Sequence, residues 1–347
     1  MMIDLGAVLS MSASRNSAMV NVRSVTFAAG RNPLTHISDY VSNCLQLAVL
    51  LEVSAYPKPG NVHRTTNFAE TRYEHFLASA VALSSHFRYA AQMGARVSQK
   101  RVTVNRIGIG RIIKDAVRAV RAWQRDKNTL LGSILLLSPM AAAAGLIIEG
   151  KEAFSADVFR TNLKSVVKST TPRDAVHVFD AINIAAPGGL GSAPRLDVKD
   201  SRSRQKILAE RISLYEIFRI SAPWDSISAE WVNDFHITFD IGYPYFKRVI
   251  KDTGDINTSS VHTFLKILSE VPDTLIARKT GKRKAEWVSS QARIVLNAGG
   301  LATPKGRKSL LELDRKLHDA SHKLNPGTTA DITSAALAVA ILEGFRP

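Results

Sequence analysis

Cysteine is almost absent from this sequence. Cys44 is the one cysteine among 347 residues, so no disulfide can form within the chain and no cysteine-based metal site can be built. The first residues also lack the basic stretch and long apolar core of a secretory signal peptide. Both features are typical of proteins in a reducing compartment, and we expect a cytoplasmic protein.

Aromatic and acidic residues are also scarce. Aromatics make up 7% of the chain, whereas Ala, Leu, Ile and Val are plentiful, which favours packed helices. The 46 Lys and Arg outnumber the 30 Asp and Glu, giving a net charge of +16. A positive surface of this size predicts an anionic partner, which could be a nucleic acid, a membrane surface or a phosphate-bearing small molecule. Because the basic residues of 278–308 lack interleaved aromatics for base stacking, we interpret them as a solvated face and do not expect nucleic acid.

Only one apolar run is long enough to raise the question of a membrane span. Residues 130–148 carry no charge over 19 positions, a length that could cross a bilayer. The run also contains Ser133, Ser138, Pro139 and two glycines. A helix buried on all sides in a soluble protein has the same kind of composition. We expect the buried central helix of a soluble bundle, and no membrane partner.

The periodicity of the remaining apolar residues predicts an all-α fold. They recur at steps of three and four residues in about ten segments, and no pair of segments has the alternation of paired strands. Residues 236–241 could be read as a strand, but their neighbours favour a helix. We expect a single multi-helix, bundle-like domain over residues 33–347, preceded by a loosely structured extension over residues 1–32.

Residues 52–63 are the stretch with the clearest chemical content. Glu52 continues the apolar face of the preceding helix, where a carboxylate is costly unless it is paired, protonated or bound to a cation. It is therefore a candidate ligand or base, and the alternative is a frayed helix end exposed to water. Pro57 and Pro59 hold Lys58 on a stiff backbone, and Gly60 permits close approach to a ligand. The alternative for this loop is a simple helix-terminating turn.

Two further segments contain glycine-rich turns. Residues 187–191, Pro-Gly-Gly-Leu-Gly, are not a phosphate loop of the Walker type, because no Gly-Lys-Ser/Thr follows. They could be a simple connector. Near the C-terminus, Asp331 lies at the start of an apolar helix, where a carboxylate that interacts with the helix dipole is the simplest explanation.

Four motifs occur in a fixed order along the chain. They are Glu52 with Pro57-Lys58-Pro59-Gly60, Asn128-Thr129 before Gly132, the turn at residues 187–191, and Asn325-Pro326-Gly327 with Ala330-Asp331. In this order and in a helical setting, they resemble the triphosphoribosyl-dephospho-CoA synthase family, and an archaeal-type branch of it in particular. His63 stands where the bacterial pattern has Asp, and Glu70 is the one residue that could replace the Asp of a missing His-x-Asp-Met segment.

The resemblance implies transfer of the triphosphoribosyl group of ATP to the 2′-hydroxyl of 3′-dephospho-CoA, with release of adenine. It implies Mg²⁺ as cofactor and ATP and dephospho-CoA as small-molecule partners. The expected catalytic residues are Glu52, Lys58 and Asp331, with Lys58 on phosphate and both carboxylates as Mg²⁺ ligands or base. The expected substrate-binding residues are Pro59, Gly60, Asn61, His63, Asn128, Gly188, Gly189, Asn325 and Gly327.

Two alternatives remain open at this stage. One keeps the transfer of a ribosyl or nucleotide group from ATP but changes the acceptor. The other is a non-catalytic binder of anionic ligands such as RNA. The affinity of such a binder would fall steeply with salt, whereas a Mg²⁺–ATP site would depend on the metal.

Overall fold

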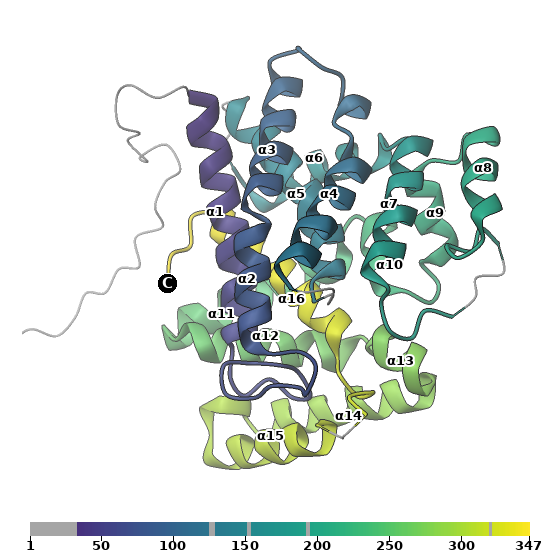
Figure 1. Ribbon diagram of the computed structural model, residues 1–347. Helices are drawn as coiled ribbons and strands as arrows, with labels where there is room; N and C mark the ends of the chain where they lie inside the picture. Colours follow the sequence, from purple (N-terminus) through teal and green to yellow (C-terminus); the bar gives the residue numbers. More distant parts are fainter. Residues whose placement is uncertain (1–32, 125–128, 151–153, 192–194, 319–320) are drawn as a thin grey trace, which may run out of the picture.

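The computed structural model describes residues 33–124, 129–150, 154–191, 195–318 and 321–347, and in these ranges the chain is helical (Figure 1). No strand occurs within them, and the only β-type pairing is an isolated bridge between His63 and Thr66. The predicted all-α class is therefore confirmed. The predicted extension, residues 1–32, lies outside the described residues.

The first half of the chain forms the upper part of the molecule in Figure 1. Its helices are α1 (Pro33–Ser54), α2 (Tyr73–Ala82), α3 (Ser84–Ser98), the short η2 (Val104–Arg106), α4 (Ile109–Trp123), α5 (Leu131–Glu149), α6 (Ala156–Lys168) and α7 (Pro172–Ala185). The periodic apolar residues that predicted them face inward. In α4, for example, Ile109, Ile112, Ile113, Ala116 and Val120 are all buried.

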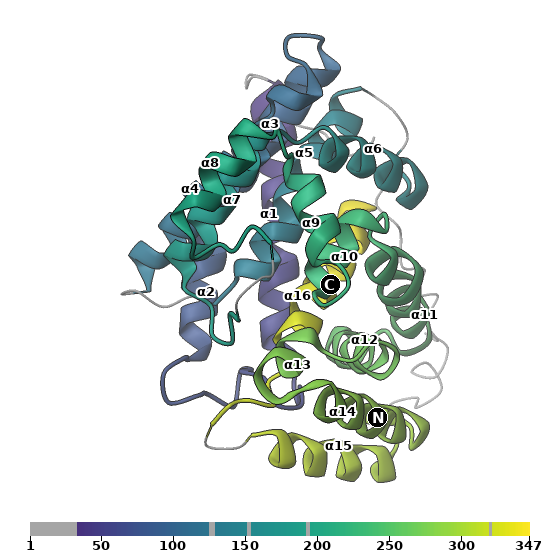
Figure 2. The same cartoon turned by 90° about the vertical axis from the view of Figure 1, so that its right-hand side faces the viewer.

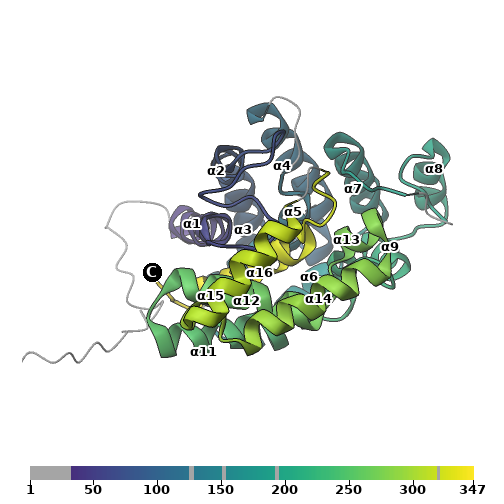
Figure 3. The same ribbon diagram turned by 90° about the horizontal axis from the view of Figure 1, so that it is seen from below.

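The second half adds an outer group of short helices and a lower layer. Its elements are α8 (Ser201–Ala209), α9 (Leu214–Ser221), α10 (Ser226–Val232), η3 (Ile237–Gly242), α11 (Tyr243–Thr253), α12 (Ile256–Glu270), α13 (Thr274–Thr280), α14 (Lys282–Asn297), η4 (Gly300–Ala302), α15 (Pro304–Leu317) and α16 (Gly327–Leu342). Viewed from below, α14 and α15 lie side by side across this layer (Figure 3). Helices α12 to α15 enclose a second, smaller apolar cluster of their own.

The centre of the molecule is built on α5 and α16. Both helices are apolar on all sides and are buried along most of their length. Helix α16 packs against α1, α5, α11 and α12, and runs through the middle of the fold in two perpendicular views (Figures 1 and 2). The long apolar run is thus the buried central helix that the sequence predicted.

Helix α5 is also the one helix of the described chain that is long and apolar enough to cross a membrane. Its mean hydropathy is 2.1, and 78% of the apolar window is buried inside the molecule. A core helix of a soluble protein meets the same criteria, so the length of this helix is weak grounds for a membrane span.

Close packing of α3 on α5 depends on two glycines. A Cβ added at Gly94 would overlap the carbonyl oxygen of Ala142, and one added at Gly145 would overlap that of Ala91. The helix backbones can approach this closely only because neither position has a side chain.

Residues 237–242, whose sequence could be read as a strand, form a π-helix. The wider turn leaves backbone groups to be satisfied by a side chain, and buried Glu230 accepts hydrogen bonds from the N–H groups of Ile237 (2.7 Å) and Thr238 (2.9 Å). The interpretation of this segment as helical, not as a strand, is confirmed.

Candidate functional site

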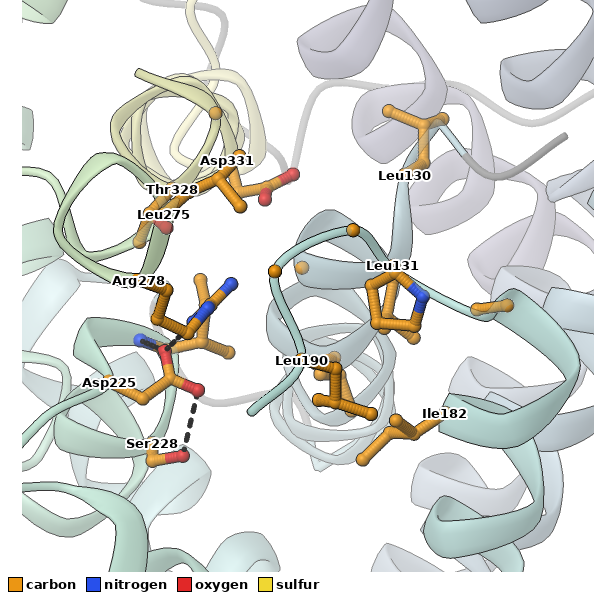
Figure 4. Close-up of a pocket in the computed structure, with 18 of the residues that line it drawn as sticks. Leu130, Leu131, Ile182, Leu190, Asp225, Ser228, Leu275, Arg278, Thr328 and Asp331 are labelled. Atoms are coloured by element: carbon orange, nitrogen blue, oxygen red, sulfur yellow. Dashed lines mark hydrogen bonds and ion pairs between the residues drawn. The ribbon is translucent and has the colours of Figure 1, made fainter. Parts of the chain in front are cut away.

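A cavity of about 780 Å³ opens where α1, α5, α13 and α16 meet the turn after α7. Figure 4 shows Asp331 and Thr328 on one side, apolar side chains such as Leu131 and Ile182 across from them, and Arg278 and Asp225 below. Segments more than 250 residues apart therefore contribute to one cavity. A mostly apolar cavity with a few convergent polar groups is typical of a small-molecule site.

Glu52 lines this cavity from the last turn of α1. The residue is 4% exposed, so the alternative of a frayed, solvated helix end is wrong. Its carboxylate pairs with the ammonium of Lys58, which also donates to the Glu52 carbonyl at 3.0 Å. Burial raises the pKa of Glu52, and the positive charge of Lys58 opposes that rise.

Lys58 takes a position that the sequence did not predict. Its side chain is buried, and it is not among the residues that line the cavity. Burial lowers the pKa of its ammonium, and the negative charges of Glu52 and Asp331 oppose that effect. In this structure Lys58 thus neutralises buried carboxylates, and its predicted contact with phosphate stays a prediction.

The loop that carries Lys58 is fixed to α15 by one carboxylate. The N–H of Gly60 donates to Asp314 Oδ1 at 3.0 Å, and a Cβ at Gly60, whose φ is +71°, would lie 2.7 Å from Leu317 Cβ. His318 Nδ1 lies 3.0 Å from the same Asp314 oxygen, and its Nε2 lies 3.1 Å from the carbonyl oxygen of Asn61. Gly60 is therefore needed for the packing of this loop.

His63 completes the same group of side chains. It is fully buried, and its Nε2 lies 3.6 Å from Asp314 Oδ2. Burial opposes ionisation of Asp314, but the hydrogen bond from His318 and the nearby His63 lower the pKa of its carboxyl to about 2. Neither Pro59, Gly60 nor His63 lines the cavity, whereas Asn61 does. The substrate contacts predicted for the first three remain predictions.

Asp331 lines the cavity from the second turn of α16. Its Oδ1 accepts hydrogen bonds from the N–H of Ser133 (2.8 Å) and from the Ser133 hydroxyl (2.5 Å), at the start of α5. The prediction that Asp331 serves the dipole of its own helix is therefore wrong, because it lies beyond the first turn of α16 and caps the start of α5 instead. Burial raises the pKa of Asp331 to about 7, and the negative charge of Glu52 adds to the rise.

The glycine before Ser133 lets the two helices meet. A Cβ at Gly132 would overlap the Asp331 carboxylate, so this position has to remain without a side chain. The predicted motif around 128–132 thus supplies Gly132, Ser133 and Thr129 to the site. Asn128 itself lies outside the described residues.

The remaining predicted binding residues also reach the cavity. Gly188 and Gly189 line it from the turn after α7, and Asn325 and Gly327 line it from the start of α16. The side-chain oxygen of Asn325 is buried and has no hydrogen-bond partner. An unpartnered acceptor at a cavity wall is costly by itself, which favours a ligand that donates a hydrogen bond or carries positive charge there.

Asp273 is a buried residue beside the cavity that was not predicted from the sequence. Its Oδ1 caps α13 through the N–H groups of Leu275 (2.9 Å) and Ile276 (3.0 Å). Its Oδ2 accepts from the N–H and hydroxyl of Thr329, both at 2.8 Å, in the first turn of α16. Asp273 therefore joins the starts of α13 and α16, the helices that carry Arg278 and Asp331. The Pro-Asp-Thr order at 272–274 indicates an N-cap, but not the second contact.

The oxygen donors of the cavity suit a hard cation such as Mg²⁺. Glu52, Asp331 and the unpartnered oxygen of Asn325 all line the same space, and the charges of the two carboxylates influence each other. Within the described part of the chain, no group of three or more His, Cys, Asp or Glu could hold a metal without other ligands. Mg²⁺ is usually bound by one or two carboxylates together with water and substrate phosphates.

Comparison with known proteins shows the same family over nearly the whole chain. A sequence model of the ATP:dephospho-CoA triphosphoribosyl transferase family matches residues 38–346. A protein of Pseudomonas fluorescens Pf-5, named as a probable 2-(5″-triphosphoribosyl)-3′-dephosphocoenzyme-A synthase, is 25% identical over 309 residues, 88% of this chain and 92% of that protein. A protein of the same name from Pseudomonas aeruginosa is 24% identical, with 84% and 86% of the two chains covered.

A solved structure shares the fold as well. The crystal structure described as that of a candidate triphosphoribosyl-dephospho-CoA synthase from Archaeoglobus fulgidus superposes with a TM-score of 0.58 at 26% identity, covering 79% of this chain and all of that one. The predicted resemblance is thereby confirmed, and this structural relative is archaeal. The chain belongs to the family of ATP:dephospho-CoA triphosphoribosyl transferases.

Proposed function

We propose that the cavity binds ATP and 3′-dephospho-CoA and transfers the triphosphoribosyl group of ATP to the 2′-hydroxyl of dephospho-CoA. The bond between ribose C1′ and the adenine nitrogen breaks, and a bond forms between C1′ and the 2′-oxygen. The hydroxyl proton goes to a base, and adenine leaves as the neutral molecule after gaining a proton. The observation that carries the proposal is the convergence of Glu52 and Asp331 on one cavity in a member of this family.

Asp331 has the properties of the base in this reaction. A general base works best when its pKa lies near the operating pH, and burial brings the pKa of Asp331 to about 7. The two hydrogen bonds from Ser133 hold one carboxylate oxygen in place. In the proposed reaction the other oxygen accepts the proton of the 2′-hydroxyl.

Glu52 supplies negative charge to the same cavity. Breaking the bond at C1′ builds positive charge on the ribose, as in glycoside hydrolysis, and a fixed carboxylate nearby stabilises that charge. Burial raises the pKa of Glu52, and the positive charge of Lys58 beside it opposes that rise and so favours the carboxylate. We therefore assign Lys58 a role that acts through Glu52, beside the phosphate contact that its motif predicts.

Mg²⁺ is proposed as the cofactor that accompanies ATP. When bound, it would neutralise part of the charge of the triphosphate, with Glu52, Asp331 and Asn325 as the protein oxygens that could hold it. Asn61, Asn325 and the glycine turns at 188–189 and 327 would orient the substrates around it.

The reaction is tested by incubating the protein with ATP, Mg²⁺ and dephospho-CoA and separating the products by chromatography. The expected product is free adenine, not ADP, formed only when dephospho-CoA is present. Adenine formed slowly and without any acceptor would mean cleavage of ATP by water and a different natural acceptor. If folded protein released no adenine under either condition, the proposed reaction would be wrong.

A further inference from the structure

We propose that Arg278 and Lys279 of α13, with the Gly188–Gly189 turn packed on them, bind the phosphate chain of a substrate. The identity of the substrates rests on the proposed function, but binding of phosphates here can be tested without catalysis. The phosphates would belong either to the triphosphate of ATP or to the pyrophosphate of dephospho-CoA, and the two share the same chemistry.

Positive charge in the cavity is concentrated at α13. Among the described residues that line the cavity, the lysines and arginines are Arg195, Arg278 and Lys279. The side chain of Arg195 is 58% exposed and lies 3.4 Å from Glu210. Lys58, the lysine that the sequence suggested for phosphate, is buried against Glu52 and does not line the space. A polyphosphate in this cavity therefore finds its cationic partners on α13.

Arg278 points into the cavity with most of its hydrogen-bonding capacity available. In Figure 4 its guanidinium projects into the space between Asp331 and Asp225. Its NH1 group lies 3.6 Å from Asp225 Oδ1, which is longer than a good charged hydrogen bond. Asp225 also caps α10 through the N–H of Ile227 (3.1 Å) and accepts from Ser228 (3.3 Å). Because Asp225 is shared among these groups, most of the five donors of Arg278 can still reach phosphate oxygens.

The glycine-rich turn positions Lys279. Gly189 has φ +74°, and a Cβ there would lie 3.1 Å from Lys279 Cγ and 3.8 Å from Arg278 Cβ. The turn therefore packs on the stems of both side chains, and both residues line the cavity, where the ammonium of Lys279 lies 3.4 Å from the carbonyl oxygen of His322. The glycine-rich turn is therefore more than a connector, because it packs on the two cationic side chains of α13.

The cavity contains charged groups of both signs. Glu52 and Asp331 supply carboxylates, and Arg278 and Lys279 of α13 supply cations. Arginine binds phosphate through paired N–H groups, and lysine adds a point charge. The α13 cations would thus contact phosphate oxygens directly, whereas the carboxylates would act on the ribose carbon or hold Mg²⁺.

The first test measures binding of inorganic tripolyphosphate by titration calorimetry. Arg278→Ala combined with Lys279→Ala should weaken binding by roughly 10- to 100-fold, the scale of losing one or two hydrogen bonds to charged groups. The matched control is Lys282→Ala. Lys282 is the first residue of α14, just after α13, its side chain is 85% exposed and it does not line the cavity. The control should change the affinity by less than about twofold. Equal affinity in the double variant and the wild type would overturn the proposal.

The second test identifies the source of the phosphates. A rise in KM for ATP in the double variant, with KM for dephospho-CoA unchanged, assigns the site to the triphosphate. The opposite pattern assigns it to the acceptor, and no rise in either KM contradicts the proposal. The double variant could lose tripolyphosphate binding while the wild-type protein releases no adenine. That result would support the phosphate site and contradict the proposed reaction.

Discussion

At the scale of single residues, the buried carboxylate of Asp331 connects stability with function. In the folded protein this group has a raised pKa and releases its proton near pH 7, whereas in the unfolded chain it would do so near pH 4. Between these two values the folded state binds more protons, so the contribution of Asp331 to stability falls as pH rises from about 4 to 7 and is constant above that range. A rise of this size corresponds to about 4 kcal/mol at most.

Asp331→Asn is therefore expected to stabilise the protein at pH 8 and to leave its stability nearly unchanged at pH 4. Asn keeps an acceptor for the two Ser133 donors and carries no charge. The gain should be about 2–4 kcal/mol in urea unfolding at pH 8. Asp115→Asn, at a surface ion pair, serves as the control and should change little. Equal stabilisation at pH 4 and pH 8 would contradict the raised pKa.

The same variant tests the catalytic role. A base must be unprotonated to act, so wild-type kcat/KM should fall as pH drops below about 7. Asp331→Asn should lower the rate by about 10²–10⁴ and remove this inflection from the pH profile. A variant that kept the inflection would show that another group titrates.

Two variants separate the contribution of the Glu52–Lys58 pair to stability from its contribution to activity. Lys58→Met leaves Glu52 buried without a partner and should cost about 3–5 kcal/mol in stability. Adding Glu52→Gln removes the buried charge and should restore most of that stability. Activity should nevertheless stay about 10²–10³ below wild type, because the carboxylate is gone. Full activity in the double variant would make the pair purely structural.

Part of this site could be predicted from local sequence. Glu52 on an apolar face indicated a buried carboxylate, because the cost of burial is a local property of the helix. The partner of Glu52 could not be predicted, because the direction of the Lys58 side chain depends on how the proline turn folds back on α1. The second contact of Asp273, with Thr329, was missed for a similar reason, since it joins positions 56 residues apart.

At the scale of elements, periodicity was sufficient to predict the long helices. The apolar run at 130–148 and the helix beginning at Pro33 are found as α5 and α1. The start of α16 was less predictable, since no threonine caps it and Thr329 bonds Asp273 instead. The packing of α3 on α5 could not be predicted, because it depends on two glycines in helices separated along the chain.

Gly145→Ala should destabilise the fold with no direct effect on the chemistry. The added methyl group would overlap the carbonyl oxygen of Ala91, and the helices would have to separate. The cost should be about 1–3 kcal/mol or more, measured by urea unfolding. Gly191→Ala is the matched control, because a Cβ there meets nothing within 4 Å. An equal effect of both substitutions would show that close packing is not what Gly145 provides.

At the scale of the whole molecule, the ordered motifs predicted more than composition could. The charge of +16 indicated an anionic partner but not its kind. The motifs lie far apart in sequence, yet each of the four contributes residues to one cavity, among them Glu52, Gly132, Gly189 and Asp331. The all-helical fold brings them together by placing α1, α5 and α16 side by side at its centre. Arg278 and Lys279 lie outside these motifs, in the basic segment interpreted as a solvated face, and for these two residues that interpretation was wrong because both line the cavity.

The central claim is that C1′ of ATP is transferred to dephospho-CoA through the cavity that Glu52 and Asp331 line. The most direct measurement follows adenine and the new dephospho-CoA derivative in one reaction, by chromatography and mass spectrometry. We predict equal amounts of the two products, a mass increase equal to one triphosphoribosyl group, and loss of both products in Asp331→Asn. Adenine without the derivative, or a derivative formed together with ADP, would contradict the account.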